Sequence, residues 1–260
     1  MKPALAFSQP DSLKSWSDFP NGDITLSAIE KELAPWWQKF FGYHLLKMGM
    51  LSSEIDTSAC TIKNQFSIAQ KYEAADIVAD IDDLPLQEQS IDVCLLSHAL
   101  EFSLDPHHII REANRVLIPN GYIIITGFNP ISLAGLNRLT PYRRKQLPWT
   151  GHFFSPLRVK DWLQLMGFEI LADQRCLHTS LVGNVAKGRV IDKWEQLAQK
   201  YLKPFASVYV IVAKKRVLPL TPIKPKWKIR TSFQPVKVTT MHSSKNNANN
   251  APRTNFSRDK

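Results

Sequence analysis

The sequence predicts an α/β protein with a doubly wound parallel sheet. Short apolar runs, typical of buried strands, alternate with amphipathic segments of helical spacing between residues 43 and 216. The clearest run, residues 91–97, is almost continuously apolar, as expected for a central strand that is covered on both faces. The 260 residues, 44% of them hydrophobic, suffice for one large domain with a buried core.

The remaining elements follow from the same periodicities and from local end signals. Apolar runs predict strands over residues 43–51, 61–69, 77–79, 122–126, 168–172 and 206–213. Helical spacing predicts helices over residues 26–41, 155–167 and 190–201, and one that begins at Pro106 and ends before a turn at 119–121. Asp105 and Ser155 are expected to cap two of these helices, Pro35 to kink the first one and Gly42 to end it.

The charge of the chain divides it into two parts. The formal net charge is +10, but residues 217–260 hold nine cationic side chains against Asp259, so only +2 belongs to the rest. Those last residues are rich in Pro, Ser, Asn and Lys and lack apolar area to offset the entropy of ordering. We therefore expect an α/β domain over residues 1–216, with residues 1–41 as an N-terminal helical cap, and a basic, largely disordered tail over 217–260.

Several classes of protein are disfavoured by composition. The three cysteines, Cys60, Cys94 and Cys176, show no CxxC pairing, so we expect reduced, small apolar side chains and no metal site. No stretch approaches 18 consecutive apolar residues, and the N-terminus lacks a signal-peptide apolar core. We expect a cytoplasmic protein with no membrane span. The sequence does not indicate an oligomeric state.

Three motifs occur in order: DIDDLP over residues 80–85, SIDVCLLSHALE over 90–101 and IIREANRVLIPNGYIIITGFNP over 109–130. With them the chain resembles, over residues 40–216, the class I S-adenosylmethionine-dependent methyltransferases of the type 11 group. The resemblance implies a Rossmann-like, mostly parallel sheet with an antiparallel last strand and helices on both faces. It also implies S-adenosylmethionine as cofactor and a methyl acceptor that the motifs do not identify.

The acidic turn after the third expected strand is a candidate adenine site. The carboxylate of Asp80 can accept a hydrogen bond from an exocyclic amine, and in the family an acid at this position binds adenine while the residue at Ile81 faces the ring. The alternative is that Asp80, Asp82 and Asp83 only solvate a turn.

The central strand holds further candidates. Asp92 either matches the acid that the family carries here or caps the strand entrance through nearby backbone donors. Ser97 and His98 stand at the carboxyl end of the strand, where open α/β sheets bind ligands. His98 either orders the cofactor, acts as a base or lines the wall. Glu101 and Phe102 occupy the place of a Glu-His pair in many relatives, so the second imidazole is missing.

The first loop departs from the family pattern. Relatives place an acid and several spaced glycines there, but residues 47–53 read KMGMLSS, and Gly49 is the single matching glycine. Ser52 and Ser53 are candidates to replace the missing loop donors. The acid that holds the ribose in relatives has no clear equivalent, and Glu73 is the nearest carboxylate. The first crossover helix is expected to be reduced or absent.

Two further segments are candidates for the substrate side of the site. Asn129 and Pro130, after the strand at 122–126, are expected at the rim. The loop that follows either meets an anionic substrate or is simply solvated; it contains Arg138, Tyr142, Arg143, Arg144, Lys145 and Trp149.

The sequence therefore predicts a methyltransferase that acts on a small molecule or an RNA nucleoside, with Gly49, Asp80, Ile81, Ser97 and His98 around the cofactor. The alternative is a non-catalytic member of the fold, a pseudoenzyme or interaction module. In either case the tail, with its cations and with Trp227 and Phe233, is a candidate for weak contact with nucleic acid.

Overall fold

The computed structural model describes residues 13–70, 75–143, 146–178, 181 and 202–217. The chain divides into two units, Met1–Pro219 and Leu220–Lys260, and every described residue belongs to the first. The expected helix at 190–201 and almost all of the tail lie outside the described residues.

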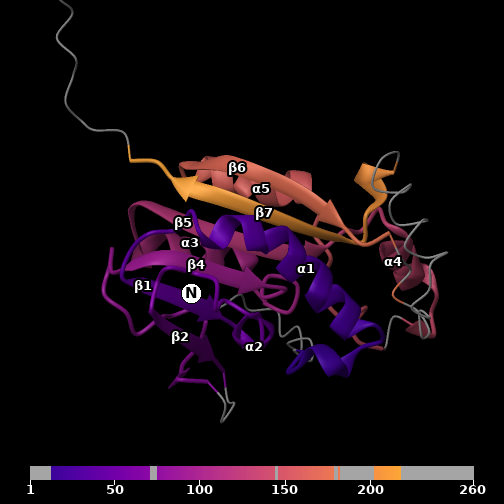
Figure 1. The fold of residues 1–260 in the computed structure, drawn as a ribbon. Helices are drawn as coiled ribbons and strands as arrows, with labels where there is room; N and C mark the ends of the chain where they lie inside the picture. The colour runs from indigo at the N-terminus through magenta and orange to yellow at the C-terminus, as the bar shows by residue number, and fades with distance from the viewer. Residues whose placement is uncertain (1–12, 71–74, 144–145, 179–180, 182–201, 218–260) are drawn as a thin grey trace, which may run out of the picture. The chain divides into compact units, whose positions relative to one another are not determined.

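The described residues form one seven-stranded sheet in the order β3-β2-β1-β4-β5-β7-β6 (Figure 1). β7 runs antiparallel to both of its neighbours, and the other pairs are parallel. The predicted Rossmann-like sheet with an antiparallel last strand is confirmed. The strands are β1 (His44–Met48), β2 (Asn64–Ala69), β3 (Ile77–Val78), β4 (Ile91–Ser97), β5 (Leu117–Phe128), β6 (Phe168–Cys176) and β7 (Val208–Lys215).

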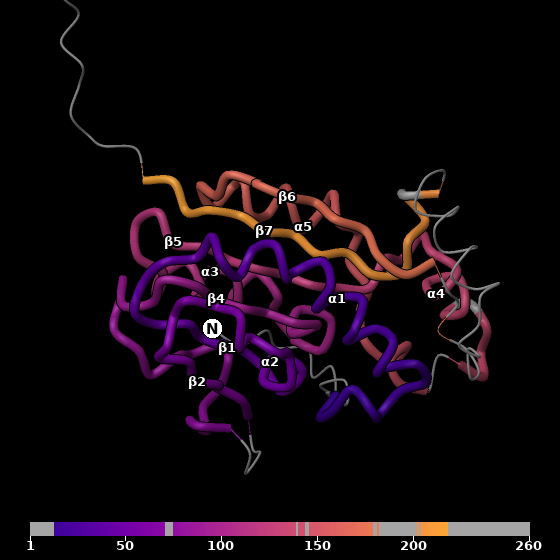
Figure 2. Tube along the Cα trace, in the orientation of Figure 1, coloured from indigo at the N-terminus to yellow at the C-terminus, as the bar shows by residue number. Residues whose placement is uncertain are grey.

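Helices cover both faces of this sheet, as predicted. One face packs its core against α1, and the other packs against α3 and α5, so α1 lies in front of the sheet and α3 and α5 behind it in Figures 1 and 2. The helical segments are η1 (Trp16–Asp18), α1 (Gly22–Trp37), α2 (Met50–Ser53), α3 (Pro106–Val116), α4 (Leu133–Leu136), η2 (Asn137–Leu139), α5 (Pro156–Leu165) and η4 (Lys203–Phe205).

The two predicted helix caps are present. The side chain of Asp105 accepts a hydrogen bond from the His108 amide at 3.1 Å, and that of Ser155 accepts one from the Arg158 amide at 3.3 Å. In both helices the proline that follows the cap occupies the first turn, where its missing amide hydrogen costs nothing.

The first helix and the first strand have other bounds than those predicted. α1 begins at Gly22, four residues before the predicted start at residue 26. It ends at Trp37, four residues before the predicted end at residue 41. The strand expected over residues 43–51 ends at Met48, because Gly49 turns the chain into α2. α2 is a single turn of four residues, so the expectation of a reduced first crossover helix is confirmed.

The turn predicted at residues 119–121 is a bulge inside a longer strand. β5 pairs with β4 at Ile91↔Leu117 and again at Val93↔Tyr122, so residues 118–121 stand opposite Asp92 alone. Asn120 adopts a left-handed conformation there, with φ 65°. The chain does bend at the predicted turn, but β5 pairs with β4 both before and after the bend.

The sheet topology decides where a ligand site can form. β1 lies between β2 and β4, so the chain winds outward in opposite directions on the two sides of the β1–β4 pair. In open α/β sheets, ligands bind in the crevice outside the carboxyl ends of the two strands at such a point, so this is where we expect a site. Gly49 and His98 each follow one of these two strand ends.

Candidate functional site

The loop after β1 turns at Gly49. This residue has φ +87°, a conformation that side-chain-bearing residues rarely adopt, and a Cβ built on it meets only the Ala99 Cβ at 3.6 Å. Its amide donates to the Ile68 carbonyl at 2.8 Å, which ties the loop to the end of β2. The glycine is thus required by the backbone angle, and a Cβ there would make only an ordinary contact with Ala99.

The two serines of this loop are engaged within the protein. Ser52 Oγ donates to the Met48 carbonyl at 2.6 Å and accepts from the Ser97 amide at 2.8 Å, so it joins the ends of β1 and β4. Ser53 Oγ donates to the Met50 carbonyl at 2.6 Å. Neither hydroxyl proton is available to a ligand in this structure, contrary to the hypothesis that these serines replace the missing loop donors.

Lys47 stands on β1 where relatives carry an acid. Its ammonium donates to the carbonyls of Ile55 at 3.0 Å and Ser53 at 3.5 Å. Burial lowers the pKa of Lys47, and the nearby carboxylates of Asp56 and Asp76 oppose this shift. A lysine inside an apolar run was the one signal in the sequence for this feature, and the sequence reasoning did not use it.

A polar cavity of about 370 Å³ adjoins Lys47. On its β2 side, the carboxylate of Asp76 accepts hydrogen bonds from the Ser67 amide at 2.7 Å and the Ser67 hydroxyl at 2.8 Å, and these bonds lower the pKa of Asp76. The cavity is lined by Lys47, Ser53, Gln65, Phe66, Ser67 and Asp76.

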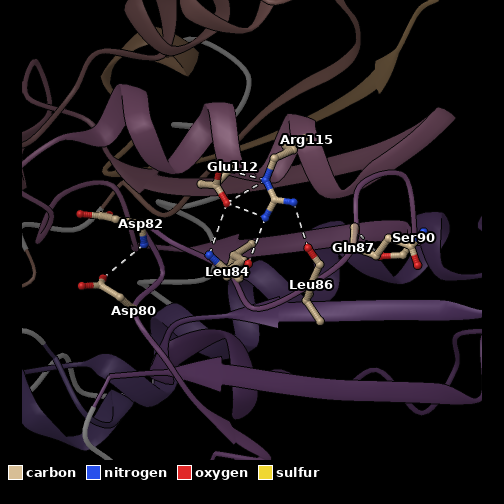
Figure 3. Close-up of polar contacts among 8 residues, drawn as sticks. All are labelled: Asp80, Asp82, Leu84, Leu86, Gln87, Ser90, Glu112 and Arg115. Carbon is tan, nitrogen blue, oxygen red and sulfur yellow. Dashed lines mark hydrogen bonds and ion pairs between the residues drawn. The ribbon is translucent and has the colours of Figure 1, made fainter. Parts of the chain in front are cut away.

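The acidic turn carries Asp80 in an exposed position two residues after β3. Its side chain accepts a hydrogen bond from the Asp82 amide at 3.2 Å (Figure 3). Its carbonyl accepts one from the Asp83 amide, also at 3.2 Å. Ile81 is half-buried beside it. The turn is therefore ordered by Asp80 itself, and its carboxylate is exposed.

A pair of charged residues on α3 holds the chain that follows this turn (Figure 3). The guanidinium of Arg115 donates to the carbonyls of Leu84 at 3.0 Å and Leu86 at 2.9 Å, and to the carboxylate of Glu112 at 2.8 Å. Glu112 also accepts from the Leu84 amide at 3.3 Å. These contacts fasten residues 84–86 to α3. We call this pair the α3 clamp.

Asp92 lies near the start of β4, at the end of the strands opposite to Gly49 and His98. Its carboxylate accepts hydrogen bonds from the amides of Tyr43 and His44, both at 2.8 Å, where β1 begins. Gly42 packs directly against it, since a Cβ there would lie 2.2 Å from Asp92 Cγ. The alternative that Asp92 caps a strand entrance is the one that the structure shows.

The carboxyl end of β4 carries a buried polar pair. His98 is 1% exposed and has a left-handed φ of 49°, and its Nδ1 lies 3.3 Å from Oε1 of Glu101, which is fully buried. The same Oε1 accepts the Phe128 amide at 2.8 Å. Ser97, one residue earlier, pairs its hydroxyl with that of Thr126 at 2.8 Å, so both its hydroxyl and its amide are engaged within the protein.

Aromatic rings surround this pair. The Phe128 ring lies 4.0 Å from the His98 imidazole, centroid to centroid, and the Trp16 indole meets the imidazole edge-on at 5.5 Å. Trp16 is itself held by a hydrogen bond from its indole nitrogen to the Leu51 carbonyl at 3.1 Å. The N-terminal turn η1 therefore bridges the first loop and His98, a contact across more than 80 residues that no local pattern indicates.

The expected substrate-side residues are mostly internal. The side-chain amide of Asn129 donates to the carbonyls of Pro204 and Ala206. Asn129 therefore joins the end of β5 to the chain that leads into β7, and it does not lie at an open rim of the site. The buried Trp149 indole donates to the Ala134 carbonyl at 2.7 Å, and the Arg143 guanidinium lies over its ring at 5.9 Å. Tyr142 is exposed, whereas Glu73, Arg144 and Lys145 lie outside the described residues.

Two other classes of site are not found in the described residues. No group of three His, Cys, Asp or Glu side chains in them is arranged to hold a metal ion. No helix among them is long and apolar enough to cross a membrane. Cys60 is half-buried and Cys94 and Cys176 are buried, and none of these three described cysteines forms a disulfide.

Comparison with known proteins places this geometry in a family. Residues 43–125 match the family model described as a methyltransferase domain. The chain is 39% identical over 221 residues to YafS of Escherichia coli K12, an uncharacterized protein, and the match covers 85% of this chain and 88% of YafS. It is 28% identical to the demethylmenaquinone methyltransferase of Chlamydia pneumoniae over 87 residues, 34% of this chain and 33% of that one.

Solved structures share the fold. A methyltransferase of Thermotoga maritima, described as a possible histamine N-methyltransferase, superposes with a TM-score of 0.53 at 18% identity and covers 78% of this chain and 90% of its own. An S-adenosylmethionine-dependent methyltransferase of Mesorhizobium loti gives a TM-score of 0.51 at 15% identity over 73% of this chain and 100% of its own. The chain belongs to the class I, Rossmann-like S-adenosylmethionine-dependent methyltransferase family.

The same fold also supports another reaction. The [4+2]-cyclase SpnF superposes with a TM-score of 0.50 at 16% identity, over 76% of this chain and 82% of its own. Membership of the fold therefore does not by itself establish methyl transfer, and the function has to be argued from the site.

Proposed function

We propose that this protein is an S-adenosylmethionine-dependent methyltransferase that acts on a small-molecule or RNA acceptor. The observation that supports the proposal is the sheet topology: Gly49 and His98 directly follow the ends of β1 and β4, where the sheet reverses its winding, and the exposed Asp80 follows β3. The matching family model over residues 43–125 supports the same reading.

The residues at the crevice fit the two ends of the cofactor. Gly49, which carries no side chain, admits the methionine portion against the backbone, and the exposed carboxylate of Asp80 accepts a hydrogen bond from the adenine amine, with Ile81 beside the ring. Ser97 contributes indirectly, because its amide is bonded to Ser52 and its hydroxyl is paired with Thr126, so it fixes the end of β4 beside the first loop.

When bound, S-adenosylmethionine supplies an activated methyl group, whose transfer leaves the electron pair of the broken carbon–sulfur bond on a neutral thioether sulfur. The protein's contribution is then positioning. In this proposal Asp80 and Gly49 contact the two ends of the cofactor. The α3 clamp fixes the chain that follows the acidic turn, and the aromatic rings beside His98 exclude water.

Calorimetric titration of the full chain with S-adenosylmethionine and S-adenosylhomocysteine tests the proposal. We expect saturable binding, weakened about tenfold in Asp80→Asn because a charged hydrogen-bond acceptor becomes neutral. Asp83→Asn is the matched control: it lies exposed on the same turn and should bind like the wild type. No heat of binding at millimolar cofactor would refute the enzymatic assignment.

A second candidate function is a non-catalytic member of the fold. It is favoured by the first loop, where Lys47 replaces the family's acid and the hydroxyl of Ser52 is used within the protein. A protein of this kind would bind S-adenosylhomocysteine weakly or not at all, so the same titration separates the two candidates.

A contact between residues 217–260 and nucleic acid is a further part of the proposal, and it depends on charge alone. The nine cations of this segment would neutralise phosphates and make binding sensitive to salt. RNA binding by the full chain and by residues 1–216, compared at near-physiological salt, tests it. Equal affinity of the two would exclude the tail as the contact.

A further inference from the structure

The buried pair His98 and Glu101 contains two polar atoms without a partner among the described residues. These are Nε2 of His98 and Oε2 of Glu101. Both side chains are at least 99% buried. A buried polar group without a hydrogen bond costs about 1–3 kcal/mol, so its presence at the carboxyl end of the central strand needs an explanation.

The contacts around the pair fit one tautomer of the imidazole. Oε1 of Glu101 accepts the Phe128 amide at 2.8 Å and lies 3.3 Å from Nδ1 of His98, so a proton on Nδ1 would complete a second hydrogen bond to that oxygen. In this neutral tautomer Nε2 has a lone pair and no donor, which is the form that a general base needs.

The position of His98 is maintained by the backbone as well. Its φ of 49° is unfavourable for a residue with a side chain, and its amide donates to the Thr126 carbonyl at 3.1 Å. Such strain persists only where surrounding contacts determine the conformation, and it is enriched at functional sites. The strained turn directs the chain from the end of β4 back toward Glu101 three residues later.

The neighbours of the pair are almost all aromatic. Phe128 and Trp16 contact the imidazole, and Phe19 extends the surface, with its ring 6.0 Å from Trp16 and 5.8 Å from Phe128. On the far side of Glu101, burial raises the pKa of Tyr209 well above its usual value, so this hydroxyl stays neutral. Aromatic rings pack well against a flat, apolar molecule, and the lone pair on Nε2 of His98 can accept a proton from a hydroxyl. The surroundings of His98 therefore suit an aromatic molecule with one ionisable hydroxyl.

We propose that His98 and Glu101 form a general-base dyad for an aromatic hydroxyl acceptor. The inference rests on the proposed methyltransferase function. As the acceptor oxygen forms its bond to the methyl carbon, the hydroxyl proton passes to Nε2 of His98, and the imidazolium is stabilised by the carboxylate of Glu101. His98 is the catalytic residue, and Glu101 is a positioning residue that acts through it. The acceptor enters where the Trp16 indole now covers the imidazole.

The tautomer of His98 tests the role of Glu101 without any cofactor. Long-range ¹H–¹⁵N correlation of the full chain labelled with ¹⁵N-histidine, with His98 assigned by its absence in His98→Asn, should show a proton on Nδ1 and a free Nε2. In Glu101→Gln, which keeps the size and an acceptor for the Phe128 amide, the Nδ1–H preference should fall at least threefold. An Nε2–H tautomer in the wild type, or an unchanged ratio in the variant, would overturn the dyad.

The acceptor class is tested with 2-naphthol as the probe. Its addition at millimolar concentration should shift the His98 Nε2 resonance, and 2-methoxynaphthalene, which lacks the hydroxyl proton, should not. In Trp16→Ala the shift should appear at lower 2-naphthol concentrations, because the indole no longer covers the ring. No Nε2 shift in either protein would exclude an aromatic hydroxyl at this position.

The failure of this inference and the failure of the proposed function are distinguishable. If His98 acts toward the acceptor, His98→Asn should change the dissociation constant of S-adenosylmethionine less than threefold. A loss of more than tenfold would place Nε2 on the cofactor and overturn the dyad's role, while the methyltransferase assignment would stand. Absence of cofactor binding in the wild type would refute that assignment, whatever the tautomer of His98.

Discussion

Removal of the α3 clamp is the perturbation whose consequence follows most directly from the geometry. Arg115→Ala removes hydrogen bonds to two loop carbonyls and leaves Glu112 with the Leu84 amide alone. Hydrogen bonds to charged groups contribute about 1.5–3 kcal/mol each, and the low end applies because the Arg115 side chain is 29% exposed. We expect the free energy of unfolding to fall by about 2–4 kcal/mol.

The loss should also reach the ligand site. The clamped chain begins at Leu84, four residues after Asp80, so a looser loop should weaken S-adenosylmethionine binding about fivefold to tenfold. Urea unfolding and calorimetric titration measure the two effects. Arg111→Ala is the matched control on the same helix: its ion pair with Asp105 is long, at 3.9 Å, and 62% exposed on the Arg111 side, so the change should stay within about 0.5 kcal/mol.

The pH dependence supplies a second check. The hydrogen bond from Arg115 lowers the pKa of Glu112 from its ordinary value of 4.5, against a smaller opposing effect of burial. A folded-state pKa below the unfolded one stabilises the protein above the unfolded value, and this stabilisation is lost as the pH falls through the folded value. The difference between wild type and Arg115→Ala should therefore shrink as the pH falls below about 4.5. A loss under about 1 kcal/mol at pH 7, or a difference that grows in acid, would refute the reasoning.

Three further outcomes are expected. Asp92→Ala should lower the free energy of unfolding in urea by about 2–4 kcal/mol, because it leaves two strand amides without an acceptor. Cofactor affinity, measured by calorimetry, should not change, since Asp92 lies at the opposite end of the strands; a large loss of affinity would contradict this. Gly127→Ala should lower the free energy of unfolding by about 1–3 kcal/mol in the same assay, because the new methyl group would lie 2.3 Å from the Tyr209 hydroxyl oxygen. Unchanged stability would show that the Tyr209 side chain can move away at no energetic cost. In the native protein a thiol reagent should modify Cys60 before Cys94, whose pKa burial raises strongly, and equal rates measured by mass spectrometry would disagree with the described packing.

Much of the fold was predictable because its signals are local. The uninterrupted apolar run of β4 has the bounds expected, and Asp105 and Ser155 cap helices as their position before a proline indicates. The errors also have local causes. The bulge at Asn120 resembles a turn, since only the partner strand reveals that pairing resumes on both sides.

The candidate site was predictable only in its location. Strand ends in an alternating α/β pattern already place Gly49, Asp80 and His98 near one edge. Their partners come from distant parts of the chain: Trp16 lies over His98, and Arg115 reaches the carbonyls of Leu84 and Leu86 from about 30 residues away, which local periodicity cannot indicate.

The sequence by itself determined the α/β class, the central strand and the edge at which a ligand site forms, because hydrophobic period and capping act over a few residues. Only the tertiary structure decided what each polar side chain does. It assigned Asp92 to two strand amides, Ser52 to the strand ends and Glu101 to His98. The physical reason is that a buried polar atom takes the partner that folding brings within about 3 Å, and that partner depends on how the whole chain packs.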